Sequence, residues 1–182
     1  AAQTEEALEF NSDSVTVMDL EPDAYRFYRI DVPNDARGWE LRLHDLTDPN
    51  AFSEPNFVLR RGQLPGGGGD TSCSSFSIGS QTQFWEGCER SGINDWTGAV
   101  RTSDGGRVGQ QLILGMDIAL DPGTYYVAVS ANGIDPVSYT LQTRGIGNLC
   151  GGEKCAIPVV DLDFNGTEGG SVIARDIGWY RV

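Results

Sequence analysis

Apolar and charged residues alternate one by one in the stretch Tyr28-Arg29-Ile30-Asp31-Val32. Successive side chains of a β-strand point to opposite faces, so this pattern predicts a strand with one buried face. Similar stripes contain Trp39, Leu41 and Leu43; Met116, Ile118 and Leu120; Tyr125, Val127 and Val129; and Tyr139 and Leu141. Turn-forming clusters such as Asp121-Pro122-Gly123 separate these stripes. Together they predict an all-β fold of antiparallel sheets, either a sandwich or a barrel.

The charge of the chain excludes several classes of partner. Its 182 residues include 26 acidic and 13 basic side chains, for a formal net charge of -13. A nucleic-acid surface needs a basic stripe, which this sequence lacks, and the same acidity disfavours anionic lipid. No apolar run reaches the length of about 18 residues that a membrane span requires. The start Ala1-Ala2-Gln3 fits the end left by signal-peptide cleavage, as expected for a mature secreted chain.

The four cysteines form two local pairs, Cys73 with Cys88 and Cys150 with Cys155. An even, paired count favours disulfides and an oxidising, extracellular location. Zinc is the alternative, but neither spacing is Cys-x₂-Cys and the one histidine, His44, is distant in sequence. We therefore expect both pairs to be disulfides in a secreted or cell-surface protein.

An internal repeat divides the chain. Leu8-Glu9-Phe10-Asn11 returns as Leu162-Asp163-Phe164-Asn165, and Phe27-Tyr28-Arg29-Ile30 returns as Trp179-Tyr180-Arg181-Val182; Ser14-Val15 likewise returns as Ser171-Val172. The repeat predicts a sandwich over residues 1–147, a disulfide-knotted linker over 148–156, and the first two strands of a second copy over 157–182. Two strands alone are marginally stable, so they must pair with the first module, a missing remainder or another chain.

Several motifs resemble the bacterial pre-peptidase C-terminal (PPC) domain. They are Arg26-Phe27-Tyr28-Arg29-Ile30-Asp31-Val32, Asn56-Phe57-Val58-Leu59-Arg60-Arg61-Gly62, Pro122-Gly123-Thr124-Tyr125-Tyr126-Val127 and Ser138-Tyr139-Thr140-Leu141. The resemblance covers roughly residues 8 to 143. It implies a jelly-roll-like β-sandwich without catalytic activity, appended to secreted proteins that are often hydrolases. Some members carry two cysteines where Cys73 and Cys88 lie here.

A calcium site is one candidate feature, because hard cations prefer several carboxylate and carbonyl oxygens. Asp45, Asp48, Asn50 and Glu54 crowd one loop, without EF-hand spacing. Related domains of bacterial collagenases bind collagen and calcium, but this chain has Asn56 where the family often has aspartate. We therefore transfer no binding residue from the family, and no other cofactor is expected.

Trp85 and Trp96 lie in a long segment of little periodicity, which the first cysteine pair is expected to staple. Exposed aromatic side chains there would offer a stacking platform for a polysaccharide or a protein. The alternative is that they cover an edge of the sandwich as a minor core.

The sequence gives no support for an enzyme. Nucleophilic hydrolysis needs a base beside the nucleophile, and His44 falls on the strand face opposite Trp39, Leu41 and Leu43. No Gly-x-Ser-x-Gly or His-Glu-x-x-His motif occurs. Two functions remain: a structural module of a surface array or fibre, or an accessory substrate-binding or secretion domain of a secreted hydrolase.

The repeat favours the array. Strands bearing Val172, Trp179, Tyr180 and Val182 would expose unpaired backbone groups and apolar side chains. Such strands recruit another chain, so we expect head-to-tail self-association through them.

Overall fold

Strands are the only regular secondary structure in the residues that the computed structural model describes. These residues are 5–22, 24–48, 51–65, 76–78, 81–83, 95–97, 99–102, 108–115, 120–167, 169 and 179–181. In chain order the strands are β1 (Glu5–Leu8), β2 (Ser12–Leu20), β3 (Tyr25–Val32), β4 (Gly38–Asp45), β5 (Glu54–Arg61), β6 (Phe76–Ile78), β7 (Gln81–Gln83), β8 (Asp95–Thr97), β9 (Ala99–Thr102), β10 (Val108–Leu114), β11 (Gly123–Asn132), β12 (Val137–Gly147), β13 (Ile157–Asp161) and β14 (Trp179–Arg181).

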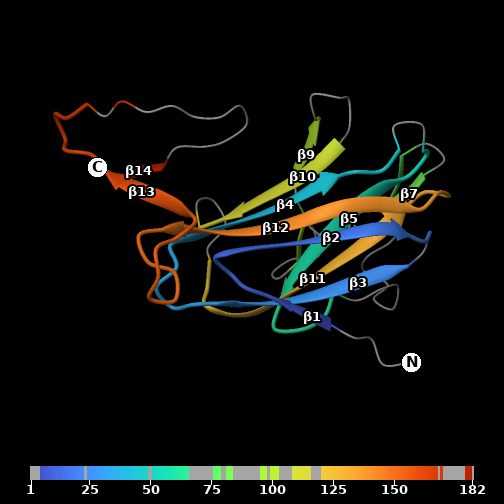
Figure 1. The fold of residues 1–182 in the computed structure, drawn as a ribbon, viewed down its shortest axis with the longest axis horizontal. Coiled ribbons are helices and arrows are strands. Elements are labelled where there is room, and N and C mark those ends of the chain that lie inside the picture. Colours follow the sequence, from blue (N-terminus) through green and yellow to red (C-terminus); the bar gives the residue numbers. More distant parts are fainter. Residues whose placement is uncertain are drawn as a thin grey trace.

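Two sheets pack face to face as a β-sandwich (Figure 1). One has the strand order β1-β3-β11-β5-β8. The other has the order β14-β13-β12-β4-β10-β9, with β2 also paired to β12. A separate ladder joins β6 to β7. The all-β sandwich predicted from the alternating stripes is therefore correct.

The core lies between the two sheets, where the predicted stripes meet. Tyr28 and Ile30 of β3 are fully buried, while Arg29 and Asp31 between them face solvent. The core also contains the following side chains from the other stripes: Trp39, Leu41, Leu43, Tyr125, Val127, Val129, Tyr139 and Leu141. Of the predicted stripe at 116–120, residues 116–119 lie outside the described residues and Leu120 lies in no strand.

The sheets are mixed, because three of their ladders are parallel rather than antiparallel as expected. β1 pairs with β3 in parallel, β12 with β13 in parallel, and β13 with β14 in parallel. After β1 the chain crosses to the opposite sheet as β2, which runs antiparallel to β12, and then returns as β3. Because of this crossing and return, β3 arrives beside β1 running in the same direction.

Candidate functional site: the C-terminal joint

A disulfide knot closes the first sandwich. The structure joins Cys150 and Cys155 in a disulfide, and both residues are buried within the main core cluster. A Cβ atom added at Gly145 of β12 would lie 2.5 Å from Cys150 Sγ and 2.8 Å from the Phe10 ring. The absent side chain of Gly145 therefore allows the knot to pack directly on the strand.

Asn11 holds the knot from the β1–β2 connection. Its Nδ2 donates a hydrogen bond to the carbonyl oxygen of Lys154 at 2.6 Å. Its Oδ1 accepts one from the N–H of Ala156 at 2.7 Å. A single amide side chain thereby satisfies one backbone acceptor and one backbone donor of the knot.

Asp35 holds the opposite side of the knot from the β3–β4 turn. Its carboxylate accepts hydrogen bonds from the N–H groups of Gly151 at 2.7 Å and Gly152 at 2.9 Å. These bonds favour the charged form and lower the pKa of Asp35. Residues 148–156, predicted as a linker, are thus anchored to the sandwich at two points and in its core.

The strand pair β13–β14 begins directly after this knot. Ile157 and Pro158 of β13 pair in parallel with Ile146 and Gly147 at the end of β12. β14 pairs with β13, and the pair lies at one end of the longest axis of the molecule (Figure 1). Within the described part of the chain, β14 has a ladder on one side only.

The β13–β14 ladder has the register of the β1–β3 ladder. Glu5 pairs with Phe27 in the first, and Val159 pairs with Trp179 in the second. The sequence repeat has an offset of 154 residues at the Leu-x-Phe-Asn motif and 152 at the aromatic strand. Applied to Glu5 and Phe27, these two offsets give Val159 and Trp179. The second ladder is therefore a copy of the first, residue for residue.

The two ladders differ in what covers them. Phe10 is 6% exposed and its ring lies 5.7 Å from that of Trp39, whereas its counterpart Phe164 is 90% exposed. Tyr28 has no exposed surface, whereas its counterpart Tyr180 is 48% exposed. The second pair thus presents core-type side chains to solvent. Of the predicted assembly residues, Trp179 and Tyr180 lie in β14, and Val172 and Val182 lie outside the described residues.

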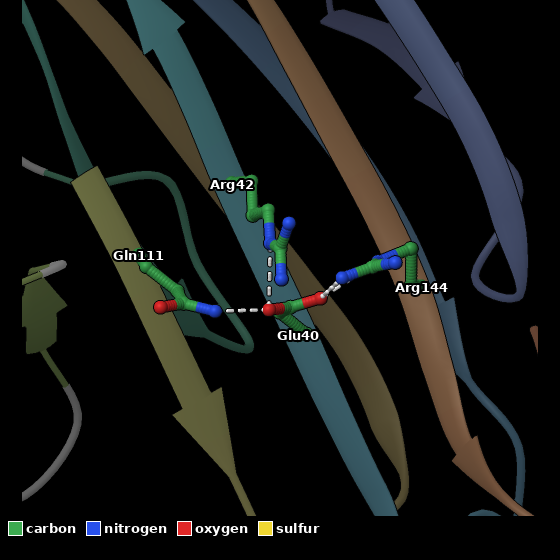
Figure 2. Close-up of polar contacts among 4 residues, drawn as sticks. All are labelled: Glu40, Arg42, Gln111 and Arg144. Carbon is green, nitrogen blue, oxygen red and sulfur yellow. Dashed lines mark hydrogen bonds and ion pairs between the residues drawn. The ribbon is translucent and has the colours of Figure 1, made fainter. Parts of the chain in front are cut away.

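A charged cluster lies on the outer face of the larger sheet. Glu40 of β4 is 2% exposed although alternation places it opposite the core stripe. Its carboxylate accepts hydrogen bonds from Arg42 Nε and Arg144 Nε, both at 2.7 Å, and from Gln111 (Figure 2). Gln111 comes from β10 and Arg144 from β12, on either side of β4 (Figure 2). Sequence reasoning missed this cluster, because its members are far apart in the chain.

His44 lies where the sequence predicts, on the exposed face of β4. Partial burial of its ring and the neighbouring Arg42 lower the pKa of His44. Its ring interacts with Arg42, Gln142, Arg144 and Glu40 of the same sheet face. The surroundings of His44 are those of a sheet surface.

Three of the calcium candidates, Asp45, Asp48 and Glu54, lie in the described part of the chain. Among the described residues, no three His, Cys, Asp or Glu side chains are grouped so that they could hold a metal ion. Asp45 instead accepts a hydrogen bond from the N–H of Thr47, and Asp48 has its carbonyl oxygen bonded to the N–H of Ala51. Glu54 begins β5, and Asn50 lies outside the described residues.

The remaining candidates belong to the segment that contains the first cysteine pair. Cys73, Cys88 and Trp85 lie outside the described residues. Trp96 is in β8 and pairs with Leu59 of β5. A Cys73–Cys88 disulfide and a tryptophan platform stay predictions, and peptide mapping without reduction tests the first.

Comparison with known proteins finds similarity among solved structures. In the described residues, no helix is long and apolar enough to cross a membrane. No protein-family model and no curated protein matches the chain. Among solved structures, it is similar to the pre-peptidase C-terminal domain of a collagenase from Bacillus anthracis, with a TM-score of 0.45 and 12% identity over 79% of this chain and 97% of that chain. The fold assignment rests on the strand ladders.

Proposed function

We propose that this protein is a non-catalytic, extracellular structural module, in which the C-terminal strand pair supplies the opening strands of the next sandwich. The observation that carries the proposal is the register of β13–β14, which copies that of β1–β3. A pair with this register and with Phe164 and Tyr180 exposed has the form of a sandwich opening without its remaining strands.

The knot supports a mechanical role for this joint. Asn11 and Asp35 anchor residues 150–156 to the first sandwich, so β13 leaves it from a fixed point rather than through a flexible linker. A fixed exit gives successive units a defined relative orientation. The donor strands and the groove that would receive them are different surfaces, so the contact is head to tail and extends into a fibre or array.

An extracellular location is supported by cysteine chemistry. The Cys150–Cys155 disulfide needs an oxidising compartment to persist. The absence of a nucleophile–base arrangement in the sequence supports a role without catalysis.

Sedimentation velocity tests the proposal. When the C-terminal strand pair of one copy replaces the opening strands of another, it forms the same kind of contacts that the displaced strands lose. The intact chain is therefore expected to form concentration-dependent oligomers. A chain truncated after Ala156 keeps the whole first sandwich and its knot, and is expected to stay monomeric. Equal behaviour of the two chains would contradict the proposal.

A second candidate function, an accessory domain of a secreted hydrolase, is favoured by the PPC-like motifs such as Thr124-Tyr125-Tyr126-Val127. That function predicts a catalytic domain in the same gene and binding of a polysaccharide or protein ligand. Loss of ligand binding in a Trp96→Ala variant that remains monomeric would support it over the array.

A further inference from the structure

We propose that the exposed segment 162–165 is a seat for a second disulfide knot, of the Cys-x₄-Cys type, that closes the sandwich opened by β13 and β14. This inference rests on the proposed function and goes beyond it by naming what the exposed motif binds.

The first copy of the motif shows what such a seat does. Phe10 lies beneath the knot, beside Gly145 and Trp39, and its carbonyl oxygen accepts a hydrogen bond from Thr143 Oγ1 at 2.9 Å. Asn11 binds the backbone of Lys154 and Ala156 on either side of Cys155. The aromatic ring thus supports the knot, and the amide fixes its backbone.

The contacts of the first copy explain why the motif has a leucine at its first position and an asparagine at its fourth. A Leu at the first position continues the parallel ladder, since Leu8 pairs with Ile30. An amide is needed at the fourth because only a group with both a donor and an acceptor satisfies one carbonyl and one N–H together. An aspartate has the same shape but lacks the donor.

The second copy occupies the same place relative to its strand pair. The Leu162 N–H donates to the Arg181 carbonyl oxygen at 2.7 Å, so Leu162 continues the β13–β14 ladder as Leu8 continues the β1–β3 ladder. Phe164 and Asn165 follow it and are exposed. In the first sandwich the same two side chains serve the knot, so the chemistry of the occupant is that of residues 150–156.

The test extends the full chain after Val182 with a copy of its own residues 31–156, because Val182 corresponds to Ile30 in the repeat. Replacing the copied Lys154 by Arg, in the added segment only, distinguishes the two knots by mass. The rate at which a thiol reduces each knot is then measured by alkylation and mass spectrometry, and folding of the added half by limited proteolysis.

We expect the second knot to resist reduction as well as the first. Asn165→Asp should accelerate reduction of the second knot about tenfold and leave the first unchanged, because the knot carbonyl that corresponds to that of Lys154 loses its donor. Asn11→Asp is the matched control and should have the reverse effect. If the added half folds but Asn165→Asp changes neither rate, the seat is wrong while the proposed function stands. If the added half does not fold, residues 157–182 do not open a sandwich, and both proposals fail.

Discussion

Val159 is paired with Trp179 in a parallel ladder, in the position that Glu5 and Phe27 occupy in the first sandwich. A one-residue slip would reverse the faces of every side chain, so agreement of the two registers preserves which residues face a core. That core is present around Tyr28 and absent around Tyr180 in the described chain.

Gly145→Ala is expected to lower the free energy of unfolding by about 2 kcal/mol, because the new methyl group would overlap Cys150 Sγ and the Phe10 ring. Gly169→Ala is the matched control, since nothing lies within 4 Å of a Cβ atom there. That change should stay within about 0.5 kcal/mol. Urea unfolding of both variants measures the difference, and equal stabilities would show that the knot does not press on β12.

Glu40→Gln is expected to lower the free energy of unfolding by about 3 kcal/mol, because it leaves two largely buried guanidinium groups without their carboxylate. The exposed pair of Arg29 and Asp31 provides the control. Asp31→Asn should cost less than about 1 kcal/mol. Chemical unfolding at pH 7 checks this order, and a reversed order would contradict the structural role of the Glu40 cluster.

His44 predicts a pH dependence of stability. The pKa of His44 in the folded protein lies below the ordinary value of 6.5, so the unfolded chain binds the proton more readily. Its contribution to stability is complete above pH 6.5 and is lost as pH falls through the lower folded pKa. His44→Gln should therefore reduce the fall in unfolding free energy between pH 7 and 5. Parallel curves for the two proteins would show that His44 does not contribute. Any activity of the native material should also survive this change.

Sequence alternation was sufficient for the strands that form the sandwich core. Tyr28, Trp39 and Tyr125 each lie in a stripe whose apolar members are buried. Alternation depends on one face being buried, and it says nothing of which strand lies beside which. The parallel ladders of β1 and β13 could not be predicted for that reason.

The site was predictable only in part. The repeated Phe and Asn of the Leu-x-Phe-Asn motif were visible in the sequence. Their contacts with the knot were not, because Asn11 forms its hydrogen bonds to Lys154 and Ala156 only in the folded chain. Asp35 gave no signal beyond that of a turn residue. Glu40 is buried, although its position on the outer face of β4 predicts an exposed side chain. Its partners Arg144 and Gln111 come from other strands, which alternation along β4 cannot identify.

The most direct test of the central claim uses an acceptor that lacks its own opening strands, residues 34–156. Without Leu8, Phe10, Tyr28 and Ile30 it loses part of the core, and alone it should be unfolded. Mixed with the intact chain, it should form a one-to-one complex in sedimentation velocity, with a gain of β-sheet signal in circular dichroism. A chain truncated after Ala156 should give neither change. If the intact chain leaves the acceptor unfolded, or if the truncated chain rescues it equally, residues 157–182 do not supply the opening strands of a neighbouring sandwich.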